Sequence, residues 1–217
     1  MAPATPEPVA VAVLARAPVA GQAKTRLIPA LGADGAAALQ ERLIERAIET
    51  ACAAAVGPVT LWTTPAPHPC FAALTSRHRV ALAVQPEGDL DVRMLAACAA
   101  ANGPAIVIGT DCPVLTPAHL RQAADVLREG TDVVVIPAED GGYVLIGSRI
   151  PQPGLFAAMT WSTDTVMAET RRRLAQGGLT WREPAQLWDV DRPEDIARLR
   201  GAGLGQLTDG LIPDLRD

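Results

Sequence analysis

Short apolar runs alternate with amphipathic stretches along most of the chain. An uninterrupted apolar run such as residues 9–15 is typical of a strand that is buried on both faces. Apolar residues that recur every three or four positions, as over residues 35–55, are typical of a helix. On these criteria strands are predicted at residues 9–15, 59–62, 79–85, 105–108, 132–137, 143–147 and near 187–190. Helices are predicted at residues 35–55, 91–101, from Thr116 onward, 163–176 and 193–200.

The order of these elements predicts an α/β fold. Strands that alternate with helices form βαβ units and therefore a mostly parallel sheet. Only five residues separate the predicted strands at 132–137 and 143–147, so the sheet should be mixed, with one reversed strand. No repeat or linker interrupts the pattern. We expect one domain over residues 1–217, with residues 1–8 and about 203–217 as loose termini.

Charge and composition narrow the class of protein. A net charge of −5 and a pI near 5.2 argue against a nucleic-acid partner. No apolar run approaches the ~20 residues that span a bilayer. The first residues show neither the basic nor the apolar region of a signal peptide. The four cysteines and three histidines lack the spacing of a zinc site. We therefore expect a cytoplasmic protein without a membrane span, and its oligomeric state stays open.

The loop that follows the first predicted strand carries candidate phosphate ligands. Arg16, Lys24 and Arg26 lie within eleven residues, and Gly21 allows a tight turn between them. Cations and free backbone N–H groups at the carboxyl end of a strand suit a polyphosphate. The pattern matches neither the dinucleotide-binding glycine motif nor the P-loop. A solvated basic loop is the alternative interpretation of this segment.

Asp111 ends the apolar run at residues 105–108. A single Asp after a strand is more often a helix cap or a turn residue than a ligand. Thr116, however, already occupies the natural cap position of the next predicted helix. An ionised carboxylate at the end of a buried strand is costly without a partner, and a hard cation such as Mg²⁺ would be a suitable one.

Two acidic segments follow later strands. Glu139 and Asp140 precede Gly141, Gly142 and Tyr143, the only tyrosine in the chain. This segment is either an acidic hairpin turn or a place where glycine backbone approaches a substrate, and the tyrosine either walls a pocket or packs in the core.

The second acidic segment holds Asp189 and Asp191. The two side chains point to the same face if the predicted strand continues through them. Asp191 could then cap the last predicted helix, while its neighbour faces the site. The sequence alone does not decide which of the two aspartates caps the helix and which faces the site.

Six motifs taken together resemble one bacterial family. They are ARAPVAGQAKTRL, GDLDVRM, VIGTDCPVLTPAHL, PAEDGGYVLIG, WSTDTV and DVDRPEDI, in this order, and the resemblance runs from about residue 9 to residue 200. The family is the DUF2064 group of GT-A-like glycosyltransferases of unknown function, some of them associated with arsenosugar biosynthesis. More distantly the chain is similar to the molybdenum-cofactor and phospholactate guanylyltransferases. The resemblance implies a nucleotide-diphospho-sugar transferase fold, a Rossmann-like three-layer α/β/α sandwich.

The resemblance also implies roles for individual residues. Arg16, Lys24 and Arg26 match the loop with which relatives embrace nucleotide phosphates. Asp111 matches the metal-binding carboxylate after the central strand, and Asp191 matches the second metal ligand.

Further residues carry over from the other motifs. Asp89 in GDLDVRM and Gly21 fall in segments that contact the nucleotide. Asp140 or Glu139 would orient or deprotonate an acceptor hydroxyl. Relatives contact the acceptor or the transferred group at the positions of Gly141, Gly142 and Tyr143. Two departures stand out. The guanylyltransferase start Leu-Ala-Gly-Gly is replaced by Leu-Ala-Arg-Ala at residues 14–17, and Asp91 stands where a glycine is commoner.

The implied activity is that of a metal-dependent glycosyltransferase with a nucleotide-sugar donor, a small-molecule acceptor and Mg²⁺ or Mn²⁺ as cofactor. A nucleotidyltransferase that releases pyrophosphate is the alternative, which the cationic loop favours because relatives use such a loop on a triphosphate. A nucleotide-binding protein without catalysis is a third hypothesis.

Overall fold

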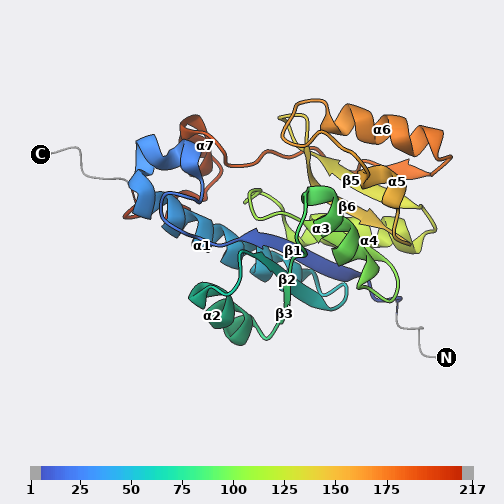
Figure 1. The fold of residues 1–217 in the computed structure, drawn as a ribbon, viewed down its shortest axis with the longest axis horizontal. Coiled ribbons are helices and arrows are strands. Elements are labelled where there is room, and N and C mark those ends of the chain that lie inside the picture. The colour runs from blue at the N-terminus through green and yellow to red at the C-terminus, as the bar shows by residue number, and fades with distance from the viewer. Residues whose placement is uncertain (1–5, 212–217) are drawn as a thin grey trace, which may run out of the picture.

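A seven-stranded sheet forms the middle of the molecule. The computed structural model describes residues 6–211. The strands are β1 (Ala10–Arg16), β2 (Val59–Thr64), β3 (Ala81–Val84), β4 (Ala105–Ile108), β5 (Val133–Pro137), β6 (Tyr143–Ser148) and β7 (Trp181–Arg182). Their order is β3-β2-β1-β4-β6-β5-β7 (Figure 1). Only β6 runs antiparallel to its neighbours β4 and β5, so the prediction of a mixed sheet with one reversed strand is confirmed.

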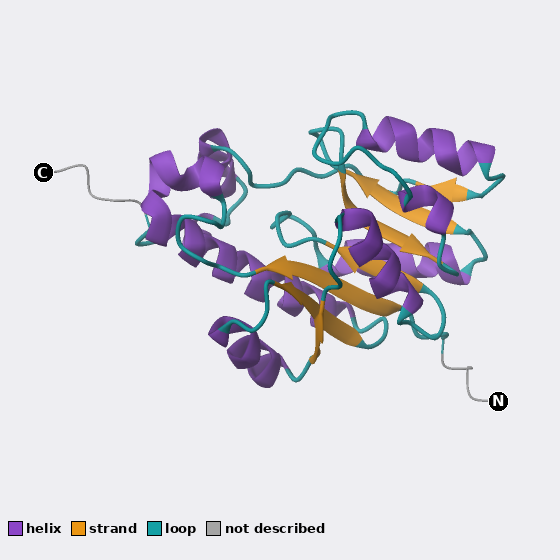
Figure 2. Cartoon of the chain, viewed as in Figure 1, coloured by secondary structure: helices purple, strands orange, loops and turns teal. Residues whose placement is uncertain are grey.

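Helices cover both faces of this sheet (Figure 2). They are α1 (Ile28–Ala54), α2 (Pro69–His78), α3 (Leu90–Ala99), α4 (Pro117–Arg128), α5 (Pro153–Phe156), α6 (Val166–Gln176) and α7 (Pro193–Gly201), with 3₁₀ turns at η1 (Thr25–Leu27) and η2 (Gly205–Leu207). One buried cluster joins the sheet to α1, α2 and α4, and a second joins its other face to α3, α5 and α6. The predicted three-layer α/β/α sandwich is therefore confirmed.

The alternation of side chains in β1 explains why its sequence is apolar throughout. Val11 and Val13 belong to the cluster beneath α1, whereas Ala12 belongs to the cluster beneath α3. Successive side chains of a strand point to opposite faces, so a central strand covered by helices on both sides needs apolar residues at every position. This packing fixes β1 and β4 as the centre of the sheet, and their carboxyl ends open toward the functional candidates.

A third buried cluster joins the start of α1 to the end of the described chain, at the left of Figure 1. Leu39 and Leu43 of α1 pack there with Leu199 and Leu207. The guanidinium of Arg42 also donates to the backbone carbonyls of residues 206, 207 and 209, over 3.3, 3.1 and 2.9 Å. Residues 203–211 of the segment expected to be a loose terminus thus pack on α1, while residues 1–5 and 212–217 lie outside the described residues.

Some predicted elements differ from those observed. The helices α2 and α5 and the short strand β7 were not predicted, and α1 begins seven residues earlier than expected, with a kink at Gly32. The predicted helix cap at Thr116 is confirmed, since its Oγ1 accepts a hydrogen bond from the backbone N–H of His119.

The strand predicted near residues 187–190 is wrong. Leu187 makes an isolated bridge beside β5, and the backbone N–H of Val190 donates to the carbonyl of Asp111 over 2.8 Å. The segment therefore bonds first with the end of β5 and then with the end of β4. A chain that crosses the edge of a sheet cannot pair along one strand. This crossing carries Asp189 and Asp191 over the carboxyl ends of the strands.

No helix in residues 6–211 combines the length and the apolar character that a bilayer crossing requires.

Candidate functional site

Two adjoining cavities lie at the carboxyl ends of the central strands, where open α/β sheets bind their ligands. The first, of about 420 Å³, is lined by Arg16, Lys24 and Arg26 and is named the basic pocket here. The second, of about 770 Å³, is named the acidic pocket; its charged lining residues are Arg26, Asp111, Glu139, Asp140, Asp164, Asp189, Asp191, Arg192, Asp195 and Arg198. Both volumes suit a small molecule. The pockets share Arg26, Leu90, Asp111 and Asp191, so they form one cleft.

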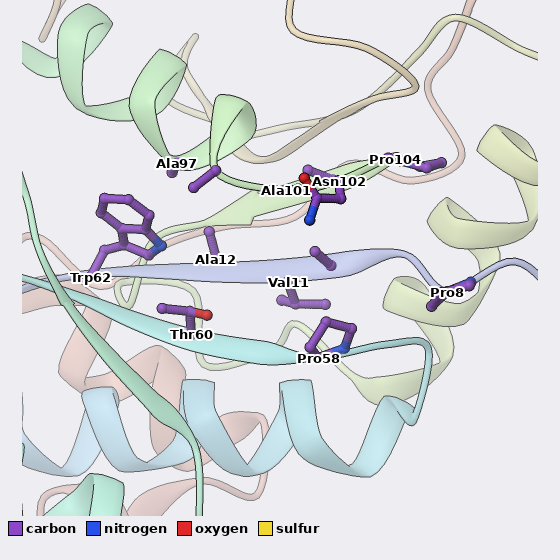
Figure 3. A pocket seen from close by; sticks show the side chains of 14 residues that line it. Pro8, Val11, Ala12, Pro58, Thr60, Trp62, Ala97, Ala101, Asn102 and Pro104 are labelled. Atoms are coloured by element: carbon purple, nitrogen blue, oxygen red, sulfur yellow. The ribbon is translucent and has the colours of Figure 1, made fainter.

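A third cavity lies at the opposite, amino end of β1, β2 and β4 (Figure 3). It has about 300 Å³, and Figure 3 shows Ala12, Thr60, Trp62 and Ala97 around it. None of the described residues that line it is charged. A nucleotide needs partners for its phosphates, so the cleft at the carboxyl ends is the better candidate site.

The loop after β1 places Lys24 inside the cleft. Gly21 turns the chain with a φ of +77°, and Lys24 itself has a left-handed φ of +46° before η1 begins. The side chain of Lys24 is only 4% exposed. Its Nζ donates to Asp111 Oδ1 over 2.8 Å and to the carbonyl of Val190 over 2.5 Å. One ammonium group thus joins the β1 loop, the β4 loop and the segment before α7.

Asp111 occupies the centre of the cleft. Its Oδ1 also accepts from the hydroxyl of Thr110 over 3.2 Å, and Gln40 donates in turn to that hydroxyl over 3.2 Å and to the carbonyl of Arg16 over 3.4 Å. The Asp111 side chain remains 50% exposed to the cleft. The sequence predicted a hard metal cation such as Mg²⁺ beside this carboxylate, which stays a prediction; the partner that the structure shows is the ammonium of Lys24.

A second carboxylate, Asp189, lies close to Asp111. Burial, followed by the negative charges of Asp140 and Asp111, raises the pKa of Asp189 from 3.8 to about 6, while Lys24 acts in the opposite direction. Asp140 and Asp111 therefore both repel the Asp189 carboxylate, and the buried ammonium of Lys24 attracts it. A carboxylate set of this kind is the donor set that Mg²⁺ and Mn²⁺ prefer.

Asp191 forms an ion pair with Arg26 across the two pockets. The interpretation of Asp191 as the cap of the last helix is wrong. The carboxylate of Asp195 takes that role, because it accepts from the backbone N–H groups of Asp191 and Arg192 over 3.0 and 2.8 Å. An acid at the third position of a helix reaches back in this way in a capping box. Asp191 is thus left to face the cleft.

The carboxylate of Glu139 is paired with Arg198. The guanidinium of Arg198 donates to both carboxylate oxygens over 2.7 and 2.8 Å, and these bonds hold the pKa of Glu139 below its usual range. The same guanidinium lies 4.4 Å from the ring centre of Trp188. Asp140, by contrast, accepts from the backbone N–H of Gly142 over 2.9 Å and lines the acidic pocket.

Gly141 fastens the acidic turn to the segment before α6. Its φ is +93°, and a Cβ at this position would lie 2.1 Å from the carbonyl oxygen of Asp164. Its own carbonyl accepts from the backbone N–H of Met167 over 2.8 Å. Glycine is needed here because the two backbones touch. Gly142 rather than Gly141 lines the cavity.

Two aromatic rings form the far wall of the acidic pocket. Tyr143 and Trp161 contact each other edge to face with their centroids 6.3 Å apart. The hydroxyl of Tyr143 lies 3.7 Å from the sulfur of Met94, and burial raises the pKa of this phenol. Asp89, expected to contact the nucleotide, stands at the start of α3 and lines neither pocket, whereas its neighbour Leu90 lines both.

The structure therefore brings most of the expected site residues to one cleft, and it adds others. Arg16, Lys24, Arg26, Asp111 and Asp191 gather around the basic pocket. Trp161, Asp164, Trp188 and Arg198 were not expected there, whereas Asp189, which the sequence left as a candidate beside Asp191, lines the acidic pocket. The Trp161 segment and Asp189 each belong to one of the six motifs, but Arg198 lies on a helix face that resembles a solvated one.

A separate group of possible metal ligands lies on α1 and α2. Glu45, Glu49 and His78 are close enough to share an ion. Arg77 and His78 already bond with Glu45 over 2.5 and 3.1 Å. The residues thus form an ion-paired surface contact between two helices.

The fold is shared with nucleotide-handling enzymes. A provisionally assigned nucleotide-diphospho-sugar transferase from Desulfovibrio desulfuricans G20 superposes with a TM-score of 0.81 at 22% identity, over 94% of this chain and 96% of that one. CMP:2-keto-3-deoxy-manno-octonic acid synthetase complexed with CTP superposes with 0.56 at 13% identity, over 92% and 100%. Rv0371c of Mycobacterium tuberculosis H37Rv, in complex with manganese, superposes with 0.51 at 19% identity, over 88% and 97%. At such identities the likeness establishes the fold alone.

Sequence comparison identifies the family. No curated protein matches the chain. The profile of the family described as "Uncharacterized protein conserved in bacteria (DUF2064)" matches residues 47–163, which include α2, α3, β4 and the acidic turn. Since this match covers more than half of the 217 residues, the chain belongs to the DUF2064 family.

Proposed function

We propose that this protein is a glycosyltransferase that binds the diphosphate of a nucleotide-sugar in the basic pocket, next to a divalent metal ion at Asp111. The ion pair between Lys24 and Asp111 is the observation that carries the proposal. A cation-binding carboxylate and a phosphate-binding ammonium lie side by side in a cleft at the carboxyl ends of the strands.

The residues present fit a divalent metal ion. Lys24 already provides a positive charge at the position that such an ion would take beside Asp111. Asp189 and Asp191 line the same cleft from the segment before α7 and would offer further carboxylate oxygens to such an ion. The resemblance to a manganese-bound structure agrees with this assignment. A bound Mg²⁺ or Mn²⁺ would neutralise the charge of the phosphates and of the leaving diphosphate.

The side chains of the chain itself would perform the remaining work. Lys24 and Arg26 would bind phosphate oxygens next to the carboxylates with which they pair and would stabilise the departing charge. Asp140 is the residue that fits best as proton acceptor for an acceptor hydroxyl, because it lines the acidic pocket. Glu139 fits this role less well, since Arg198 occupies both of its oxygens.

Transfer of a nucleotidyl group is the second candidate function. Three cations, Arg16, Lys24 and Arg26, line the basic pocket, and a triphosphate would use them more fully than a diphosphate. The two reactions differ in the bond that breaks: a glycosyltransferase releases a nucleoside diphosphate, and a nucleotidyltransferase releases pyrophosphate.

A thermal-shift panel tests the proposal. Nucleoside diphosphates, triphosphates and nucleotide-sugars are each added with Mg²⁺, Mn²⁺ or EDTA, because a ligand that binds only the folded state raises the melting temperature. We expect a metal-dependent shift with diphosphates and with one nucleotide-sugar. A shift confined to one triphosphate would favour nucleotidyl transfer, and binding without product would favour a non-catalytic protein. The absence of any metal-dependent shift would contradict all three.

A further inference from the structure

The acidic pocket carries far more negative than positive charge. Seven carboxylates line it, from Asp111, Glu139, Asp140, Asp164, Asp189, Asp191 and Asp195, against three guanidinium groups, from Arg26, Arg192 and Arg198. The basic pocket next to it has three cations and only two carboxylates, Asp111 and Asp191. The two ends of the cleft are therefore suited to ligand groups of opposite chemistry.

Two of the three arginines in the acidic pocket are already occupied. Arg198 bonds to both oxygens of Glu139 and covers a face of Trp188, and Arg26 pairs with Asp191. Arg192 is exposed at the rim and forms no ion pair among the described residues. A phosphate or carboxylate that entered this pocket would meet one unpaired cation, Arg192, against a majority of carboxylates, and like charges in contact oppose binding.

The remaining lining offers hydrogen-bond acceptors and an apolar wall. The carboxylates of Asp140 and Asp164 form no ion pair within residues 6–211, so both can accept from a ligand. Ser162 and Thr163 add hydroxyls beside them. Ser162 has a left-handed φ of +61°, which is unusual for a residue other than glycine and is found preferentially at ligand sites. Trp161 supplies the apolar surface against which a carbon skeleton can pack.

We propose that the acidic pocket binds the acceptor, and that the acceptor is a molecule rich in hydroxyl or amine groups that carries neither a phosphate nor a carboxylate. Hydroxyl and ammonium groups donate hydrogen bonds, which is what an excess of carboxylate oxygens requires. This inference rests on the proposed function, since that function assigns the basic pocket to the phosphates of the donor.

Binding of matched compounds tests the inference. The probes are glucose, glucosamine, glucuronate and glucose 6-phosphate, together with glycerol, 2-amino-1,3-propanediol, glycerate and glycerol 3-phosphate. Each set keeps the carbon skeleton and changes the charge. Binding to the full chain with Mg²⁺ is measured by ligand-observed NMR, and the nucleotide that gives a thermal shift is included to fill the basic pocket. We expect the neutral or amine member to bind about tenfold or more tightly than its anionic counterparts. A preference for the amine over the polyol would identify an ammonium ligand.

Two variants locate the binding. Trp161→Ala removes the apolar wall, and Asp164→Asn removes one charge while it keeps the backbone contact with Gly141. Both should weaken the neutral and amine probes several-fold, whereas Asp125→Asn on the exposed face of α4 should not. Equal or tighter binding of the anionic members, no binding by any probe, or binding that both variants leave unchanged would overturn the inference. The metal-dependent rise in melting temperature with nucleotide is measured in parallel on the wild type and on both variants. If the wild type shows this rise, the proposed function stands whatever the acceptor probes do, and if it does not, the proposed function itself fails.

Discussion

The basic and acidic pockets differ in how the chain builds them as well as in charge. Arg16, Lys24 and Arg26 come from one continuous loop after β1, so their proximity in space follows from their proximity in sequence. The acidic pocket is assembled mainly from the turn before β6, the loop before α6 and the chain from the crossing segment into α7, and it also includes Arg26, Leu90 and Asp111. The cations of a phosphate site can thus come from one loop, while the proposed acceptor site depends on the tertiary structure. The two pockets should therefore respond differently to the same kind of change.

Asp111 belongs to both pockets, and its loss should have the largest effect. We expect Asp111→Asn to lower metal-dependent nucleotide affinity on the order of 100-fold or more, because an amide replaces the central carboxylate ligand. The variant also leaves the ammonium of Lys24, only 4% exposed, without its counter-charge, and we expect a loss of about 2 kcal/mol in stability. Titration calorimetry with Mn²⁺ and nucleotide measures the first effect, and urea denaturation measures the second.

A double variant separates these two effects. Asp111→Asn combined with Lys24→Met removes both charges, so it should regain stability without regaining metal binding. If Asp111→Asn alone kept the full metal-dependent affinity for nucleotide, the assignment of the metal ion to Asp111 would be wrong.

Gly141→Ala should damage the acidic pocket and leave the basic pocket intact. The added methyl group would lie 2.1 Å from the backbone oxygen of Asp164, at a φ of +93°. Relief of this overlap requires the loop before α6 to move, and we expect a cost of about 3 kcal/mol in the free energy of unfolding. The matched control is Gly142→Ala, whose nearest contact is a side-chain oxygen at 3.3 Å, with an expected cost below about 1 kcal/mol. Equal urea midpoints for the two variants would show that the backbone contact is unimportant.

The same contrast explains how far the sequence could predict the site. The apolar runs identify β1, β4, β5 and β6 because a strand covered on both faces must be apolar at every position. Lys24 and Asp111 are visible because each lies in the loop at the carboxyl end of such a strand. Their mutual ion pair was not predicted, since no local pattern encodes a contact between residues that are 87 positions apart.

Other residues fail prediction for equally physical reasons. Asp195 was not recognised as the helix cap because an acid at the third helical position and an acid at the cap position give similar patterns. The crossing segment looks like a strand because Leu187 and Val190 are apolar, but the backbones of these two residues bond to the ends of two different strands. Arg198 lies on a helix whose exposed face carries several charges, so nothing local marks its bond to Glu139.

Lys24→Met should change the basic pocket in two opposite directions. Without the ammonium, Asp111 is free to bind a metal ion, and we expect the affinity for Mn²⁺ alone to rise about tenfold. The affinity for nucleotide with metal should fall about tenfold, because a buried phosphate ligand is lost. Arg26→Met serves as the control, with smaller effects, since the Arg26 side chain is 65% exposed and its pair with Asp191 is screened by water. Weaker binding of Mn²⁺ alone to Lys24→Met would contradict the competition between the two cations.

Asp189→Asn should give the smallest effect, and its sign depends on pH. The pKa of Asp189 is raised from 3.8 to about 6 by burial and by Asp140 and Asp111, so between these pH values the folded protein binds a proton that the unfolded chain has released. Stability must therefore fall as pH rises through this interval, by about 3 kcal/mol for a fully buried carboxylate and by roughly 1–2 kcal/mol for this partly exposed one. The amide cannot ionise, so the variant should match the wild type near pH 4 and exceed it by this amount above pH 7. Urea denaturation at both pH values in EDTA measures the difference. If the difference in stability between the variant and the wild type were the same at both pH values, the Asp189 carboxylate would not be held among the other acids of the acidic pocket.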